Sequence, residues 1–449
     1  FDIYYYQFKP MRKIVIFLSI LFSSHFLIAQ NEKLPLQALD VFDLEWVSDP
    51  QISPDGTQVV YRRNGFDIMK DNSRGNLWII NTDGLSHRKL TSREVNESQA
   101  SWSPNGDRIA FVSSTDEGSE LYMYWINTGQ IAKLSQLDKS PGNLTWSPDG
   151  KHLAFTMFIA EKAPVIAEML TKPEGAKWAE PARITDRLKH EADGSGYMKP
   201  GFAHIFIIPA EGGIPERITY HSASDYLTDY TKDNNIIFST RRDFAQVERE
   251  YETHMVSVKG GTPSRIMTSV GFDAKLSPNG KYIVFVKGSC RIQREAYKGA
   301  ANRNIWLYDI ANDVYTQLTT FDGNDFYPQW GNDSTIYFQS SRSGKYNVHK
   351  LTINDKGQKV GEIEQITFFK EMGIFSFNLS SNGKNLVLVN GDQLFNIDVI
   401  SKTQKEILSR ENNGAVFSTA CPTLVEMVSL YFPELKGNLS PLYSPLQSH

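Results

Sequence analysis

The tetrapeptide Ser53-Pro54-Asp55-Gly56 decides the fold, because close copies of it recur along the chain. Ser-Pro-Asn-Gly stands at 103–106 and 277–280, Ser-Pro-Asp-Gly at 147–150, and weaker copies at 231–234, 331–334 and 380–383. In such a turn the serine hydroxyl accepts backbone hydrogen bonds, proline presets its φ angle, and glycine takes a left-handed φ angle. Each copy therefore predicts a tight turn between two strands.

The spacing of the turns predicts the architecture. Each turn precedes a short apolar strand, a second strand, and a third that ends in an aliphatic residue and Thr or Ser, as at Leu90-Thr91 and Ile218-Thr219. Periods in the forties with several short strands are typical of four-stranded propeller blades. We count seven units, at 48–91, 95–135, 141–219, 223–267, 270–319, 325–367 and 374–408. We therefore predict an all-β protein, a β-propeller of about seven blades resembling WD40 or TolB repeats, whose ring protects the edges of its sheets.

Two further features belong to this repeat. Trp102, Trp146 and Trp330 each precede a turn, where a large ring can pack between neighbouring blades. The third unit is too long and contains an insertion at 156–203. Long insertions in repeat proteins gather on one face, often the binding face, although a tolerated surface loop is the alternative. Within the insertion the candidates for substrate binding are Trp178, Arg187 and Tyr197.

The N-terminal residues predict export. A basic start at 11–13, an apolar run from 14 to 29 with a short polar break, and polar residues from Gln30 onward are typical of a signal peptide within residues 1–30, with 1–10 preceding the initiator Met11. An uncleaved anchor is the alternative, but the run is short for a membrane span. We expect a periplasmic or extracellular protein with no stable membrane span after cleavage.

The sequence contains two cysteines, Cys290 and Cys421. They lie far apart in the sequence, and we expect no disulfide between them.

No catalytic motif is found in the 449 residues. The chain has no Gly-x-Ser-x-Gly nucleophile elbow, no His-Glu-x-x-His pair and no phosphate-binding glycine loop, so we assign no catalytic residue, metal site or cofactor. The net charge of -4 gives no reason to expect nucleic acid as a partner. We interpret Asp67, Asp71, Asp225 and Asp229, and the charged stretch 241–250, as solvated loop residues.

Particular stretches resemble known families. The stretches 41–45, 48–56, 140–150, 174–178, 186–189 and 204–206 resemble the N-terminal propeller of prolyl-oligopeptidase-family serine peptidases of the acylaminoacyl-peptidase and dipeptidyl-peptidase-like kind, over about 38–218. The stretches 219–226, 241–251, 290–299 and 319–326 resemble tricorn-like peptidase propellers, and the TolB-type repeat in general, over about 219–400. The change near Thr219 raises the possibility that two related genes are joined there.

The resemblance implies a propeller that gates a separate catalytic domain. Such a domain would carry out acyl transfer on a serine. We expect the propeller to occupy residues 38–410. Residues 411–449 match neither family, and we expect them to be a truncated or frame-shifted tail. We therefore expect the substrate-gating portion of an exported peptidase, with peptides or short polypeptides as partners. The alternative is a TolB- or tricorn-like propeller that binds proteins or peptides. Since the tail could leave the ring unsealed, we also expect marginal stability.

Overall fold

The computed structural model describes residues 37–162, 170–179, 185, 190–192, 196–242, 251–374, 376–391 and 393–408. The chain divides into Phe1–Asp43, where Ala38–Asp43 forms the 3-10 helix η1, and Leu44–His449, which holds every described strand. No helix in the described ranges has the length and apolar character needed to cross a bilayer. The predicted signal peptide and the tail at 411–449 lie outside the described residues.

Seven antiparallel sheets of four strands make up the unit Leu44–His449. The first three blades are β1 (Trp46–Ile52), β2 (Gln58–Asp67), β3 (Asn72–Asn81) and β4 (Arg88–Lys89); β5 (Glu97–Trp102), β6 (Arg108–Thr115), β7 (Gly118–Trp125) and β8 (Ile131–Lys133); and β9 (Pro141–Trp146), β10 (His152–Ala160), β13 (Gly201–Pro209) and β14 (Glu216–Arg217). Between β10 and β13 the short hairpin β11 (Glu191–Ala192) and β12 (Gly196–Tyr197) forms a separate sheet.

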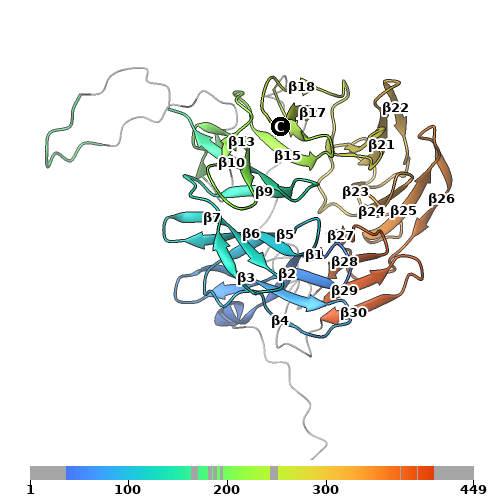
Figure 1. The fold of residues 1–449 in the computed structure, drawn as a ribbon, viewed down its shortest axis with the longest axis horizontal. Coiled ribbons are helices and arrows are strands. Elements are labelled where there is room, and N and C mark those ends of the chain that lie inside the picture. The colour runs from blue at the N-terminus through green and yellow to red at the C-terminus, as the bar shows by residue number, and fades with distance from the viewer. Residues whose placement is uncertain are drawn as a thin grey trace, which may run out of the picture. The chain divides into compact units, whose positions relative to one another are not determined.

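The remaining four blades repeat the same order. They are β15 (Asp225–Tyr230), β16 (Asn235–Thr240), β17 (Glu252–Ser257) and β18 (Ser264–Arg265); β19 (Phe272–Leu276), β20 (Tyr282–Lys287), β21 (Asn304–Asp309) and β22 (Val314–Gln317); β23 (Asp325–Trp330), β24 (Thr335–Ser340), β25 (Asn347–Ile353) and β26 (Lys359–Gln365); and β27 (Phe377–Leu379), β28 (Asn385–Asn390), β29 (Gln393–Asp398) and β30 (Gln404–Leu408). Figure 1 shows the seven sheets around a ring. The predicted seven-bladed propeller is confirmed.

The repeated turn joins the first and second strands of a blade. In the first blade the Ser53 hydroxyl accepts the backbone N–H of Gln58 at 3.0 Å and donates to the Asp55 carboxylate at 2.5 Å. Gly56 has a φ angle of +80° and donates its N–H to the Ser53 carbonyl. Ser147, Ser277 and Ser380 make the same pair of hydroxyl bonds. In each of these four turns one serine hydroxyl therefore holds the turn together.

The aliphatic-Thr/Ser pair holds the end of each blade. The Thr319 hydroxyl accepts the N–H of Ile305, where the third strand of the fifth blade begins, at 3.0 Å. Equivalent bonds join Ser135 to Leu121, Thr219 to Ile205 and Thr367 to Val348. These donors are buried, so the hydroxyl satisfies an N–H that water cannot reach.

The three tryptophans join neighbouring blades. Each indole N–H donates to a backbone carbonyl of the preceding inner strand at 3.0 Å, Trp102 to Gln51, Trp146 to Ser101 and Trp330 to Lys275. The predicted position between blades is confirmed, and the hydrogen bond explains why tryptophan rather than phenylalanine stands there.

The first and last blades pack directly against each other. One apolar cluster combines five side chains of the first blade with five of the last: Val47, Ile52, Val59, Tyr61 and Ile80 with Val387, Val389, Leu394, Ile407 and Leu408. The Ile52 N–H donates to the Asn378 side chain at 3.0 Å, and the Lys405 ammonium donates to the Asp83 carbonyl at 2.9 Å. Side-chain packing and hydrogen bonds between described residues of the first and last blades therefore seal the ring.

The third and fourth blades, on either side of Thr219, also share one core. Ala154, Ile205, Ile207 and Ile218 of the third pack against Leu227, Tyr230, Ile236, Phe238 and Val256 of the fourth. The point where the family resemblance changes is thus an ordinary blade interface.

Candidate functional site

The inner strand of most blades carries a bulge at the same position. Asp49, Gln99, Asn143, Asp273 and Tyr327 all have φ angles between +49° and +55°, and each stands four residues before the first residue of a repeated turn. The pairing register shifts at the same point in the inner strand of blades one to six. A bulge of this kind re-aims side chains. The residues four and two positions before each turn therefore form the candidate wall of the channel.

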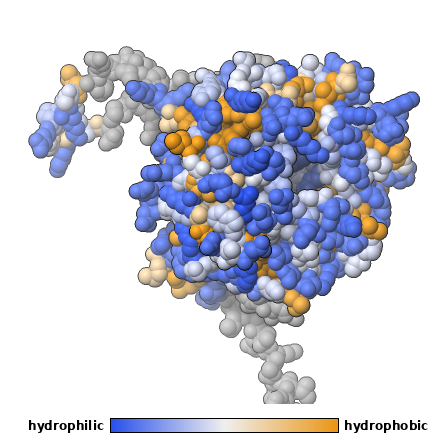
Figure 2. All heavy atoms as spheres, viewed as in Figure 1, coloured by the Kyte–Doolittle hydropathy of each residue, from blue (hydrophilic) through white to orange (hydrophobic). Residues whose placement is uncertain are grey.

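Three neighbouring inner strands enclose a pocket on this wall. Its volume is about 240 Å³, and its lining consists of Asp273, Lys275, Tyr327, Pro328, Gln329, Ser376 and Phe377 from β19, β23 and the start of β27. Figure 2 shows that the ring is hollowed near its centre. We call this space the axial pocket.

One carboxylate of the axial pocket lacks a hydrogen-bond partner, whereas Gln329 donates to the Phe377 carbonyl at 2.8 Å. The Asp273 Oδ2 atom is buried and accepts no hydrogen bond from the described residues. Burial raises the pKa of the Asp273 carboxyl, against the opposing charges of Lys275 and Arg303. Arg303 lies over the rings of Phe272 and Phe326, at 4.6 and 5.9 Å, and its Nε atom also has no partner in the described part of the chain. Desolvation lowers the pKa of Arg303.

Two carboxylates that the sequence analysis interpreted as solvated are in fact structural. Asp229 lies in β15 and accepts the N–H of Leu276 in the next blade at 3.0 Å. Burial raises the pKa of this carboxyl. Asp225 is fully buried at the start of β15. The solvated interpretation was wrong for both because each carboxylate compensates a buried donor. The interpretation as a solvated residue holds for Asp71, which is exposed in a turn.

The charged stretch at 241–250 also contains a structural residue. Arg242 donates both to Asp225 Oδ1 and to Asp225 Oδ2 at 3.1 Å. The sixth blade repeats this pair, with Arg342 donating to Asp325 at 2.8 and 3.0 Å. The interpretation of Arg242 as a solvated loop residue was therefore wrong, since a buried carboxylate needs a charged partner. Residues 243–250 lie outside the described ranges.

The structure describes two of the three candidate residues of the insertion, and both are exposed. Trp178 is 46% exposed, and Tyr197 is 51% exposed, lying in β12 with its ring stacked on His190. Arg187 lies outside the described residues. The assignment of these three residues to substrate binding stays a prediction.

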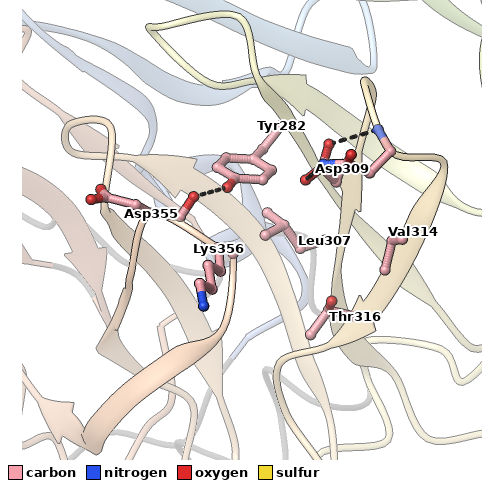
Figure 3. Close-up of a pocket in the computed structure, with 9 residues that line it drawn as sticks. Tyr282, Leu307, Asp309, Val314, Thr316, Asp355 and Lys356 are labelled. Atoms are coloured by element: carbon pink, nitrogen blue, oxygen red, sulfur yellow. Dashed lines mark hydrogen bonds between the residues drawn. The ribbon is translucent and has the colours of Figure 1, made fainter.

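A second pocket lies between the outer parts of the fifth and sixth blades. It has a volume of about 280 Å³, and its lining includes Tyr282, Leu307, Asp309, Asp355 and Lys356 (Figure 3). The Tyr282 hydroxyl donates to the Asp355 carbonyl at 2.7 Å, and Asp309 accepts the N–H groups of its own turn at 3.1 Å. Several polar groups of the outer pocket are thus already satisfied, whereas the Asp273 Oδ2 atom of the axial pocket has no hydrogen-bond partner among the described residues.

The sequence contained a signal for the axial pocket that the analysis missed. Positions four and two before each turn carry charge in the first, fourth and fifth units only, as Asp49, Asp229, Asp273 and Lys275. Reading these two positions across all seven units would have placed a cluster of charge on the fourth and fifth blades.

Comparison with known proteins agrees with this architecture. The family model "Tricorn protease N-terminal beta propeller domain" matches residues 198–403, and "TolB beta propeller domain" matches residues 42–183. The chain is 24% identical to the uncharacterized peptidase YuxL of Bacillus subtilis over 78% of this chain and 54% of that protein. It is 27% identical to dipeptidyl-peptidase 5 of Porphyromonas gingivalis over 72% of this chain and 48% of that protein. The chain carries a β-propeller of the prolyl-oligopeptidase-family peptidase type.

Solved structures show the same fold. The acylaminoacyl peptidase of Pyrococcus horikoshii superposes on the peptidase-type propeller with a TM-score of 0.61 at 14% identity, covering 83% of this chain and 54% of that one. The propeller domain of the trilobed protease of Pyrococcus furiosus, described as having an open velcro topology, gives 0.54 at 17% identity and covers 81% of this chain and 98% of that one. The chain spans about half the length of the two peptidases it matches in sequence. Since the match to YuxL covers 78% of the chain, it includes residues on both sides of Thr219.

A third family model, "Iron only hydrogenase large subunit, C-terminal domain", matches residues 391–449. Strands β29 and β30 of the last blade occupy the first part of this range. Iron–sulfur clusters need several thiolate ligands, and Cys421 is the only cysteine in the matched segment. The residues do not fit such a cluster, and the described part of the chain contains no group of three side chains that could hold a metal ion.

Proposed function

We propose that the chain is the gating portion of an exported serine peptidase. In this proposal the ring admits peptides or short polypeptides along its axis toward a catalytic domain and keeps folded proteins out. The observation that carries the proposal is the axial pocket, where the Asp273 Oδ2 atom has no hydrogen-bond partner among the described residues, in a propeller whose relatives are peptidases. Polar groups that water or a passing peptide can satisfy suit a passage, whereas a purely structural core would pair them.

The test measures binding and turnover on the full chain. Fluorescein-labelled peptides of three to ten residues should bind in an anisotropy titration, and a labelled folded protein of similar charge should not. Acyl-peptide and aminoacyl chromogenic substrates should not be hydrolysed, since no nucleophile elbow is present in the sequence. Serine-dependent turnover, or equal binding of the folded protein, would contradict the proposal.

A TolB- or tricorn-like binding module is the second candidate. It is supported by the exposed aromatic residues Trp178 and Tyr197 on the insertion and by the TolB family match at 42–183. A folded envelope protein that binds in a one-to-one ratio, and loses affinity when both rings are replaced by alanine, would favour this candidate over gating.

Export is tested separately. If the basic and apolar residues 11–29 act as a signal peptide, fractionated cells should contain the chain outside the cytoplasm, with a new N-terminus near Gln30. Mass spectrometry of the purified chain gives this terminus directly, and an intact N-terminus in a cytoplasmic fraction would refute export.

A further inference from the structure

A long loop of the fifth blade stands apart from the equivalent loops of the ring. Residues 288–303 join β20 to β21 without a helix or strand, whereas the corresponding loops of the first, second and sixth blades are only 68–71, 116–117 and 341–346. Loops longer than about 12–15 residues without secondary structure are uncommon in compact domains and are usually either functional or disordered. Contacts with the sixth blade hold this loop in place, which favours a function.

Polar groups of the sixth blade anchor the loop. The Glu295 carboxylate accepts the Tyr346 N–H at 2.5 Å. The Tyr346 hydroxyl donates to the Ile292 carbonyl at 2.8 Å, and Tyr346 itself is buried. The side chain of the buried Asn324 donates to the Arg294 carbonyl at 3.2 Å. A loop fixed in this way loses little conformational freedom when a ligand binds to it.

Three cations of the anchored loop face solvent. Arg291, Arg294 and Lys298 are exposed, and none of them forms an ion pair with another described residue. The Arg294 guanidinium lies 4.2 Å from the centre of the Tyr297 ring, which holds its plane while its N–H groups keep no acceptor among the described residues. Guanidinium groups bind carboxylates through paired N–H donors.

The two carboxylates in contact with the loop do not pair with these cations. Glu295 forms its ion pair with Lys345 at 3.1 Å. Asp322 accepts the Asn302 side chain at 2.7 Å and the Gly299 N–H at 3.2 Å. The three exposed cations therefore stay available to a ligand, in a chain whose net charge is -4.

The loop stands at one mouth of the candidate channel. Strand β20 runs antiparallel to the inner strand β19, so β20 ends where β19 begins, whereas the repeated turn 277–280 joins their other ends. Phe272 and Ala300 both line a small pocket of about 160 Å³ at the base of the loop. Arg303, the last residue of the loop, lies beside Asp273 of the axial pocket. A peptide on this loop would therefore lie next to the channel wall.

We propose that residues 288–303 form a docking surface for acidic peptides at this mouth, with Arg291, Arg294 and Lys298 receiving the carboxylates. The choice of a peptide rests on the proposed gating function, and the preference for acidic side chains comes from the loop. A nucleic acid fits less well, because surfaces that bind nucleic acids are ordinarily basic over a whole face and this surface is one loop of an acidic chain.

The experiment compares two end-blocked peptides by isothermal titration calorimetry on the full chain. One is Gly-Glu-Gly-Glu-Gly-Glu-Gly, and in the other glutamine replaces each glutamate. The glutamate peptide should bind about 10-fold more tightly, since several exposed ion pairs add up to that difference. The preference should be largest at about 0.05 M salt and should disappear near 1 M salt, where charges are screened beyond about 3 Å.

Two triple variants with the same change of net charge locate the effect. The loop variant carries Arg291→Gln, Arg294→Gln and Lys298→Gln, and it should bind the two peptides equally. The control variant removes three exposed cations from turns at the opposite ends of the strands, which form no ion pair with described residues: Lys259→Gln, Lys281→Gln and Lys384→Gln. It should keep the preference of the parent chain. Circular dichroism checks that both variants are folded.

Equal binding of the two peptides by the parent chain would overturn the docking surface, as would loss of the preference in the control variant. Tighter binding of a DNA tetranucleotide, which also carries three charges, would overturn it in favour of a nucleic acid. If both peptides bind equally and a folded protein does not bind, the gating function stands and only this inference fails. If the glutamate peptide is preferred but a folded protein of similar charge binds as well, the docking surface stands and the gating function fails.

Discussion

The seam between the first and last blades can be tested by Leu394→Ala. Leu394 is fully buried in the cluster that joins these blades. The substitution removes three carbons, which costs about 2.4 kcal/mol in transfer free energy at about 0.8 kcal/mol per CH₂ group. The cavity left behind raises the loss to about 3 kcal/mol. This corresponds to roughly a 100-fold increase in the population of the opened seam.

Hydrogen–deuterium exchange measured by mass spectrometry locates the effect. If the seam closes the ring, Leu394→Ala should speed exchange in β1 and β2 of the first blade as well as in β28 and β29, although no first-blade residue is changed. Leu121→Ala is the control, because Leu121 is equally buried but packs in the core of the second and third blades. Faster exchange confined to β28 and β29 would show that the ring is open and would refute the sealed seam.

Two further predictions concern single side chains. Trp146→Phe removes the indole N–H donor and leaves the Ser101 carbonyl unpaired, so urea unfolding should show a free energy of unfolding lower by about 1–3 kcal/mol. Trp125→Phe is the control and should cost less, because the Trp125 indole makes no hydrogen bond to the described residues. Burial lowers the pKa of His349 to about 4, so the unfolded chain binds a proton at higher pH than the folded chain does. The free energy of unfolding should therefore fall by up to about 3 kcal/mol between pH 6.5 and pH 4. His349→Phe should lack this part of the pH dependence, and an unchanged dependence of its unfolding free energy on pH would contradict the prediction.

Local chemistry made the ring predictable. A serine, a proline and a glycine at fixed positions specify a turn whatever surrounds them. Four full copies and three weaker ones therefore located the seven blades. Asp225 and Asp229 were misread for the opposite reason. Their surroundings depend on Arg242 and on Leu276, which come from another strand and another blade, and a pattern in one segment cannot reveal which distant donor will face it.

The axial pocket could be predicted from the sequence only in part. The bulge recurs at the same distance before the turn in most blades, so its position follows from the repeat. What did not follow was that the Asp273 Oδ2 atom would have no hydrogen-bond partner among the described residues. Which side chains lie near Asp273 depends on the neighbouring blades, and the repeat within one blade does not specify them.

Six of the seven described blades are built from strands that are consecutive along the chain, and in the third the hairpin β11–β12 stands between β10 and β13. This arrangement matters during synthesis. A ribosome adds roughly 5–20 residues per second, so a blade of about 45 residues emerges within roughly two to nine seconds. Each blade then holds all four of its own strands and can fold on the face of the one made before it. The blades can therefore form one after another in the order of translation. The contact between the first blade (46–89) and the last blade (377–408) can form only after all seven blades have been made.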